Sequence, residues 1–302
     1  MKLRKSGADY ALDIFILAFM VVILAVTLYP FLNSLAISFN HADDTTRGGV
    51  GLWPRVFTVR NYERIFQNPM LYNAYMITVA RTAIGTVTGL FFTSILAFGL
   101  AHSNLVGRRL YMIVCIIPMY FGGGLIPYYF LVRGLGLNNS FWVYVIPLMV
   151  NIWNMVIMRT FFQNIPAALE ESARIDGANY WTVFFRIVVP ISSPMIAAIA
   201  LFIGVSHWNA WFDAAIFIND QNLKPMQSIL ISIVNEARFA ERIAAAAGGN
   251  AVDMGNIGRG REVNVRSLTM ATMVVTILPI VLVYPFLQKY FIKGIMVGSL
   301  KG

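Results

Sequence analysis

The most informative stretch of this sequence is residues 164–190, NIPAALEESARIDGANYWTVFFRIVVP, a polar segment between two long apolar runs. Pro166 suits the first turn of a helix, where its missing N–H removes no hydrogen bond. Glu170 and Glu171 lie near the positively polarised start of that helix. Gly177 suits the C-terminal cap. The stretch therefore predicts a short, firmly terminated helix held between two membrane spans.

The predicted helix has a compact face of small residues. Leu169, Ser172 and Ala173 share that face by their i, i+3 and i+4 spacing, and Arg174 lies elsewhere on the surface. Such an element can dock in a cleft of a partner protein and transmit rigid-body motion to both neighbouring spans.

The rest of the chain has the composition of a membrane protein. Its 302 residues are 58% hydrophobic and 12% charged, whereas a soluble domain carries roughly 25% charged residues. The mean hydropathy is +0.67. A hydrocarbon core of about 30 Å needs roughly 20 apolar helical residues per span. The sequence predicts an all-α polytopic membrane protein, with six spans near 11–37, 74–100, 110–131, 141–162, 187–211 and 268–291.

One transmembrane domain, residues 1–302, is expected, because no internal repeat is visible. Residues 163–186 form the polar loop that contains the short helix, and residues 213–266 form the longest outer loop. Proline and glycine inside the spans predict kinked helices, since lipid offers no replacement hydrogen bonds. These residues are Pro30, Pro118, Gly122, Gly123, Gly124, Pro127, Pro147, Pro194, Pro279 and Pro285.

The N-terminal apolar run has two interpretations. Lys2, Arg4 and Lys5 precede it, and the small-x-small pattern at 34–36 is typical of a signal-peptide cleavage site. The run is longer than a signal h-region, so we expect an uncleaved first span. A cleaved signal peptide is the alternative.

Orientation follows from the Lys and Arg residues in short flanks. With six spans, one side collects Lys2, Arg4, Lys5, Arg108, Arg109, Lys289, Lys293 and Lys301. Both termini and the 163–186 loop are therefore expected on the cytoplasmic side. Arg residues in the long outer loops weaken this argument without reversing it.

Several function classes are disfavoured. The net charge of +9 is scattered over loops instead of forming a basic stripe, which disfavours nucleic-acid binding. Cys115 is the single cysteine, so no intramolecular disulfide or thiolate metal site is expected. Phosphate-loop, nucleophile-elbow and H-E-x-x-H motifs are absent, so no catalytic or metal site is expected. An ion-coupled secondary transporter and a membrane-embedded enzyme are the alternative classes; the former needs buried ionisable groups and often inverted repeats.

The polar stretch resembles the EAA loop of ABC importer permeases, E-A-A-x-x-x-G followed by nine residues and I-x-L-P. The residues that carry the match are Glu171, Ser172, Ala173, Gly177, Ile187, Val189 and Pro190. Asp176 and Ala178 strengthen the similarity to sugar-transporting members. The sequence departs from the motif at Ser172 and Val189, and both replacements are conservative.

The resemblance extends over essentially the whole chain. The tail 293–302 is similar to the C-terminal ending of the second permease of maltose-type carbohydrate importers, and the long outer loop is similar to that of the LplC/YtcP branch. The resemblance implies a type I ABC importer permease fold in the bacterial cytoplasmic membrane. It also implies uptake of an oligosaccharide, with a second permease, two ATPase subunits that bind ATP and Mg, and an extracytoplasmic solute-binding protein as partners.

In this family the EAA helix inserts into a groove of the ATPase subunit, and this chain itself needs no cofactor. The resemblance assigns ATPase coupling to Glu170, Glu171, Ser172, Ala173, Arg174, Asp176, Gly177 and Pro190. It assigns a tail contact with the ATPase to Lys301 and Gly302.

Candidate substrate contacts lie near the end of the fifth span. His207, Trp208, Asn209, Trp211 and Phe212 combine aromatic faces with an amide, a chemistry that stacks on sugar rings and binds hydroxyls. The alternative is an interfacial aromatic belt with a packed histidine.

Arg81 and two glycines stand out in the second span. Arg81 is costly in lipid and either serves an anionic-sugar pathway or snorkels to the outer surface. Gly85 and Gly89 form a G-x-x-x-G step, which favours close packing of two helix backbones.

Overall fold

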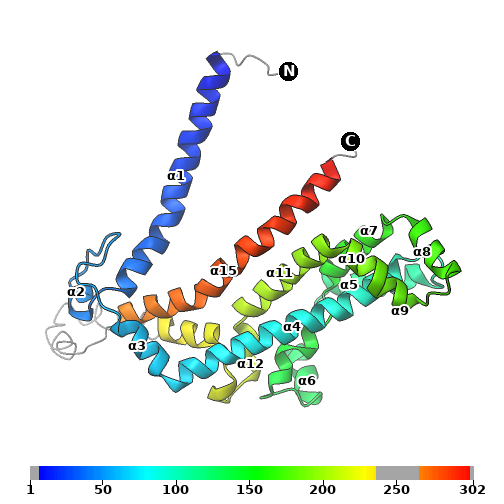
Figure 1. The fold of residues 1–302 in the computed structure, drawn as a ribbon. Helices are drawn as coiled ribbons and strands as arrows, with labels where there is room; N and C mark the ends of the chain where they lie inside the picture. Colours follow the sequence, from blue (N-terminus) through cyan, green and yellow to red (C-terminus); the bar gives the residue numbers. More distant parts are fainter. Residues whose placement is uncertain (1–6, 236–264, 300–302) are drawn as a thin grey trace. The chain divides into compact units, whose positions relative to one another are not determined.

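The computed structural model describes residues 7–235 and 265–299, and these are largely helical (Figure 1). The predicted tail contacts of Lys301 and Gly302 lie outside the described residues, as does the glycine-rich part of the outer loop.

The chain forms two compact units. The first contains residues 1–68 and 230–277, and the second contains residues 69–229 and 278–302.

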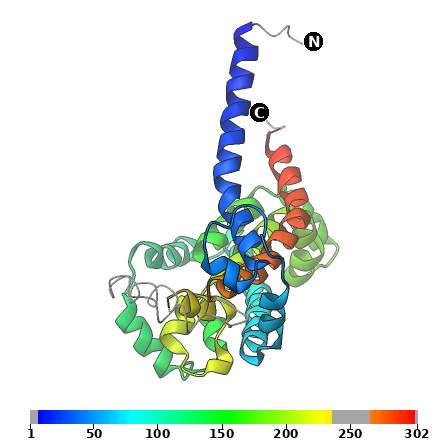
Figure 2. The ribbon, with the colours of Figure 1, turned by 90° about the vertical axis from the view of Figure 1, so that its left-hand side faces the viewer.

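The first unit begins with α1, Gly7–Ser38, which Figures 1 and 2 show as one continuous helix. Its 32 residues correspond to about 48 Å at 1.5 Å per residue, enough to cross a membrane. Pro30 does not interrupt α1, although a kink was predicted there. The hydroxyl of Ser34 donates a hydrogen bond of 2.8 Å to the Pro30 carbonyl, so this polar group is satisfied within the helix.

The interval after α1 was expected to be a loop, but it contains two short helices, α2 (Ala42–Thr46) and α3 (Arg60–Gln67). The side chain of Asn40, which is fully buried, links α2 to the segment before α3 by hydrogen bonds. Its amide nitrogen donates to Asp44 and Thr45 at 2.9 Å each, and its oxygen accepts from the Val56 backbone at 3.0 Å. The Asn40 hydrogen bond, together with Arg55, holds the pKa of Asp44 below its usual value.

The second unit is built around α4, Pro69–Ala101, which packs mainly against α11 (Ser193–Asn209) and α7 (Ile152–Gln163) (Figure 1). Buried Ala97 of α4 and Met155 of α7 belong to one apolar cluster of this unit. Because lipid tails are as apolar as these side chains, van der Waals packing stabilises such contacts in a membrane.

Three of the predicted spans are broken. Helices α5 (Arg108–Tyr120) and α6 (Leu125–Gly134) meet at 118°. The break coincides with the predicted glycine run, and Gly124 has a φ of +83°, which glycine adopts without strain. The predicted span 110–131 corresponds to this bent pair of helices, and the predicted kink is confirmed here.

The fourth span bends by 43° between its two segments. Its first segment consists of η1 (Phe141–Tyr144) and η2 (Ile146–Leu148), and α7 follows. The side chain of Asn151 caps α7 by accepting a hydrogen bond of 2.9 Å from the Asn154 N–H.

The fifth span is bent by 85° at Ser192. Three short elements precede the bend: α9 (Tyr180–Val183), the π-helical turn η3 (Phe184–Val188) and α10 (Val189–Ile191). The predicted span 187–211 is therefore divided by a kink, as its proline predicted, and the long apolar helix in it is α11.

The sixth span is the single helix α15, Val265–Ser299, with Pro279 and Pro285 inside it. The structure thus contains three helices long and apolar enough to cross a membrane, or six spans if each bent pair counts as one, within residues 7–235 and 265–299.

A second apolar cluster joins α6, η1 and α12 (Phe212–Phe217). The expected outer loop, residues 213–266, contains the helix Met226–Asn235, which follows the short turn η4 (Gln221–Leu223). The Thr78 hydroxyl accepts a hydrogen bond of 2.8 Å from the Met226 N–H, which fixes the start of this helix against α4.

Candidate functional site: the coupling helix

The short polar helix predicted from residues 164–190 is α8, Ala167–Ile175. Pro166 is its N-cap residue, with an extended ψ of 125°, and Asp176 is its C-cap residue. The predicted helix and both of its boundaries are confirmed.

The C-terminus of α8 is closed by a Schellman motif. Gly177 has a φ of +83°, and its N–H donates to the Arg174 carbonyl at 3.1 Å. The Ala178 N–H donates to the Ala173 carbonyl at 2.9 Å. A Cβ atom on Gly177 would meet nothing within 4 Å. Within this chain, Gly177 is therefore needed for its left-handed backbone and not for close packing.

One side of α8 faces the chain and the other is exposed. Ala173 and Ala178 pack against the apolar cluster that contains Met155. Glu171 and Ser172 are exposed. The surface that α8 presents combines these polar side chains with the exposed apolar side chains of Leu169 and Ile175.

A groove of about 380 Å³ runs beside α8. Its polar lining comes from α8, the end of α7, the start of α5 and the link between α4 and α5. These residues include His102, Arg108, Gln163, Glu170, Glu171 and Arg174. His102 and Arg108 were missed as site residues by the sequence argument. The short basic link between the second and third spans was the available signal.

Pro190 is separated from the long helix that follows. It lies in α10, directly after the π-helical turn η3, and the bend at Ser192 comes before α11. A π-helical turn shifts the hydrogen-bond register, and the lack of an N–H on proline leaves one backbone carbonyl without its usual helical partner. The structure therefore places α9, η3 and α10 as a bent connection between α8 and α11.

Arg81 does not snorkel to the surface. Its side chain is 0% exposed and forms an ion pair with both carboxylate oxygens of Asp213. It also donates to the Ala210 carbonyl at 3.0 Å and lies over the Tyr144 ring at 4.2 Å. The Arg81 charge is thus neutralised within the second unit.

The structure divides the other candidate substrate residues into two groups. His207 and Trp208 are buried, whereas Asn209, Trp211 and Phe212 are exposed. The His207 ring lies against Gly85 of α4, where a Cβ atom would come within 2.5 Å of it. The G-x-x-x-G step therefore packs as predicted, and His207 is a packing residue of that contact.

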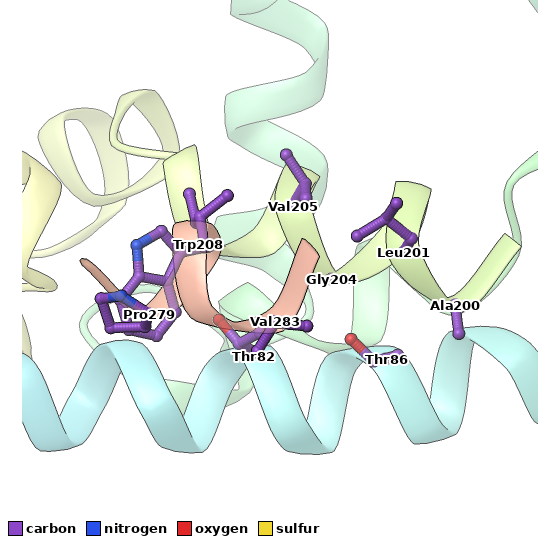
Figure 3. Close-up of a pocket in the computed structure, with 10 residues that line it drawn as sticks. Thr82, Thr86, Ala200, Leu201, Gly204, Val205, Trp208, Pro279 and Val283 are labelled. Carbon is purple, nitrogen blue, oxygen red and sulfur yellow. The ribbon is translucent and has the colours of Figure 1, made fainter. Parts of the chain in front are cut away.

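A cavity of about 250 Å³ lies between α4, α11 and α15 (Figure 3). Its lining is mostly apolar and includes Trp208 and Pro279, and Thr82 and Thr86 border it from α4. The hydroxyls of both threonines are buried without a hydrogen-bond partner in the described part of the chain. These threonines were also missed, although their i, i+4 spacing places them on one face of α4.

Comparison with known proteins is consistent with this architecture. Residues 11–297 match the family model described as the binding-protein-dependent transport system inner membrane component. The chain is 37% identical over 290 residues to the polygalacturonan/rhamnogalacturonan transport system permease protein YtcP of Bacillus subtilis (strain 168), covering 96% of this chain and 98% of that protein. It is 35% identical over 300 residues to the protein LplC of the same organism, covering 99% and 98%.

A solved structure has the same fold. It belongs to a bacterial ABC transporter involved in the import of the acidic polysaccharide alginate. It superimposes with a TM-score of 0.85 at 28% identity, covering 96% of this chain and 100% of that one. The predicted fold class, an all-α membrane protein with the type I ABC importer permease fold, is confirmed. The chain belongs to the family of binding-protein-dependent transport system inner membrane components, and it is a membrane permease subunit of an ABC importer.

Proposed function

We propose that this chain imports an acidic oligosaccharide as one half of a permease heterodimer. Two ATPase subunits and an extracytoplasmic solute-binding protein complete the proposed complex. Support for the sugar class comes from two independent likenesses, one to a polygalacturonan/rhamnogalacturonan permease and one to an alginate importer. Both polygalacturonan and alginate are polymers of uronic acids, so their fragments are anionic at neutral pH.

The observation that carries the proposal is the construction of α8. It is short, preceded by Pro166, closed at its C-terminus by a Schellman motif, exposed on one side and packed against the unit's core on the other. Its exposed residues include Glu171, Ser172 and Asp176, which are assigned to the ATPase contact. ATP and Mg are bound by the partner subunits, and this chain supplies no cofactor site in the proposal.

The arrangement in the membrane follows from the same assignment. If α8 docks on a cytoplasmic ATPase, both termini lie in the cytoplasm and the region of α2 and α3 lies outside. This agrees with the distribution of Lys and Arg in the short flanks.

For the sugar itself, we assign contact to the exposed aromatic and amide side chains at the end of α11. Trp211 and Phe212 present rings to solvent, and Asn209 lies beside them in the sequence. We assign packing and charge neutralisation to Arg81 and His207, because both are buried with partners inside this chain.

Uptake into proteoliposomes tests the proposal. The permease pair, ATPase subunits and binding protein are reconstituted together, and uptake of labelled oligogalacturonides is compared with that of neutral maltooligosaccharides of equal length. We expect uptake that requires ATP and the binding protein and that favours the acidic series. Preference for the neutral series would refute the acidic assignment. Uptake driven by an ion gradient without ATP would favour the secondary-transporter alternative.

A further inference from the structure

His102 joins the end of α4 to the coupling helix. It follows the last residue of α4, and its Nδ1 lies 2.8 Å from the Phe98 carbonyl oxygen of the same helix. Its Nε2 lies 2.7 Å from Oε1 of Glu170 in α8, which is 68 residues away in the sequence. Both partners of the ring are oxygen atoms that accept hydrogen bonds.

The number of hydrogen bonds that the ring can donate to these two oxygens depends on its protonation state. A neutral imidazole carries one N–H and can donate to only one of the two oxygens, whereas the imidazolium donates to both. The bond to Glu170 is then charge-assisted and stronger than a neutral one. Glu170 and His102 are both about three-quarters buried, with side-chain exposures of 26% and 22%, so solvent screens the pair only in part.

Neighbouring aromatic rings fix the orientation of His102. Phe98 and Tyr180 each approach the imidazole edge-on, with ring centroids at 4.6 and 5.7 Å. The guanidinium of Arg174 lies over the Tyr180 ring at 4.7 Å. The other charged groups that line this groove are Arg108 and Glu171. His102 is thus held in place to meet Glu170 and no other carboxylate.

The contact between His102 and Glu170 joins α4 to α8, two helices that do not follow one another along the chain. Helix α8 is linked covalently to α7 before it and, through α9 to α10, to α11 after it. Helix α4 has no such link to α8, yet it is the helix that carries Gly85 against α11 and Arg81 against Asp213.

We propose that His102 is a positioning residue that couples α8 to α4, so that displacement of the coupling helix by the ATPase reaches α4 directly. The link between the two helices is the hydrogen bond between Nε2 of His102 and Oε1 of Glu170. This inference rests on the proposed function, since it requires that α8 is the element the ATPase moves.

The test uses the reconstituted importer and measures labelled oligogalacturonide transported per ATP hydrolysed. We expect His102→Ala and Glu170→Ala each to lower this ratio about three-fold to ten-fold, the range for a partly screened charge-assisted pair. The double variant should be no worse than either single variant, because both remove the same interaction. The matched control is His41→Ala, which removes a histidine paired with Asp43 at 3.9 Å, far from α8 in the sequence.

Rescue by a variant that keeps donor groups separates coupling from a merely structural role. His102→Arg keeps N–H donors at this position, so we expect it to retain more of the wild-type ratio than His102→Ala. Hydrogen exchange of the α8 amides, measured at one pH without ATP or sugar, should be faster in His102→Ala than in wild type.

Wild-type ratios in both single variants, or additive losses in the double variant, would overturn the inference. If one variant is lost during purification, Glu170→Gln tests the same interaction, because it keeps the size of Glu170 and removes its charge. The transport ratio is then measured for Glu170→Gln. A wild-type importer that shows no ATP-dependent uptake would instead refute the proposed function. The hydrogen exchange of the α8 amides would then test the contact between His102 and Glu170 independently of uptake.

Discussion

Gly85 marks a point where a single methyl group decides the packing of two helices. A Cβ atom at this position would lie 2.5 Å from both Cε1 and Nε2 of His207, whose ring is buried. Nothing lies within 4 Å of the equivalent position at Gly99 on the same helix. Gly85 and Gly99 of α4 therefore have different roles.

We expect Gly85→Ala to destabilise the protein by about 1–3 kcal/mol through overpacking. Gly99→Ala, the matched control, should be neutral or stabilising by up to about 1 kcal/mol, because alanine favours helix. Thermal unfolding of the purified permease measures both. Adding His207→Ala to Gly85→Ala should restore much of the loss, and equal stability of the two single alanine variants would contradict the packing model.

The buried ion pair of Arg81 and Asp213 is expected to contribute to the stability of the protein. Asp213→Ala should destabilise the protein by about 3–5 kcal/mol, because it leaves a buried guanidinium unpaired. Arg81→Met together with Asp213→Ala should recover most of this stability. We also expect the double variant to retain uptake. A stable double variant without uptake would instead assign Arg81 to the sugar pathway.

Among the secondary-structure elements, α8 depends on one backbone conformation. The φ of +83° at Gly177 closes the Schellman motif, and open space surrounds the position. The turn and the approach of a partner are two separate reasons for a glycine here, and they predict different responses to substitution.

Gly177→Leu should uncouple ATP hydrolysis from uptake or release the ATPase, because a left-handed leucine costs about 1–2 kcal/mol and adds bulk to the docking surface. Gly177→Asn should retain more uptake, because asparagine tolerates this conformation. Gly134→Leu is the control, since Gly134 has equally open surroundings and no positive φ. Uptake and co-purification of the ATPase are the measurements, and normal uptake with Gly177→Leu would refute the coupling role of α8.

Two of the membrane-spanning segments contain sharp bends between their helices. Helices α5 and α6 meet at 118°, and the two parts of the fifth span meet at 85°. Each break leaves backbone groups without their usual helical partners, which lipid cannot satisfy. Such breaks are tolerated where protein surrounds them, and buried Val183, Phe184 and Val188 show that this holds before the bend at Ser192.

For the whole molecule, topology is the property to test. Single cysteines at Ser172 in α8 and at Gln67 in α3 are placed in a Cys115→Ser background. Both positions are exposed, so both should react once the membrane is permeabilised. In intact cells an impermeant maleimide should label Gln67 and not Ser172. The sequence predicts that cysteines at Ser6 and Ser299 behave like Ser172. Labelling of Ser172 in intact cells would reverse the orientation.

The sequence by itself determined the class of protein and the position of helix α8, to which we assign coupling. Both depend on local information: apolar runs of span length are required by the thickness of the bilayer, and α8 is bounded by Pro166 and Gly177, which act on their own backbone. The close approach at Gly85 was also predicted, because a G-x-x-x-G step is a local pattern.

Only the tertiary structure decided where the spans break, which residues are buried and what pairs with what. The 85° bend at Ser192 lies beside Pro194, where a kink was predicted, but the sequence does not specify the size of the bend. Arg81 and Asp213 are 132 residues apart, and His102 and Glu170 are 68 apart. Such pairs form because the helices that carry them pack side by side, and that arrangement is a property of the folded chain that hydropathy and spacing do not encode.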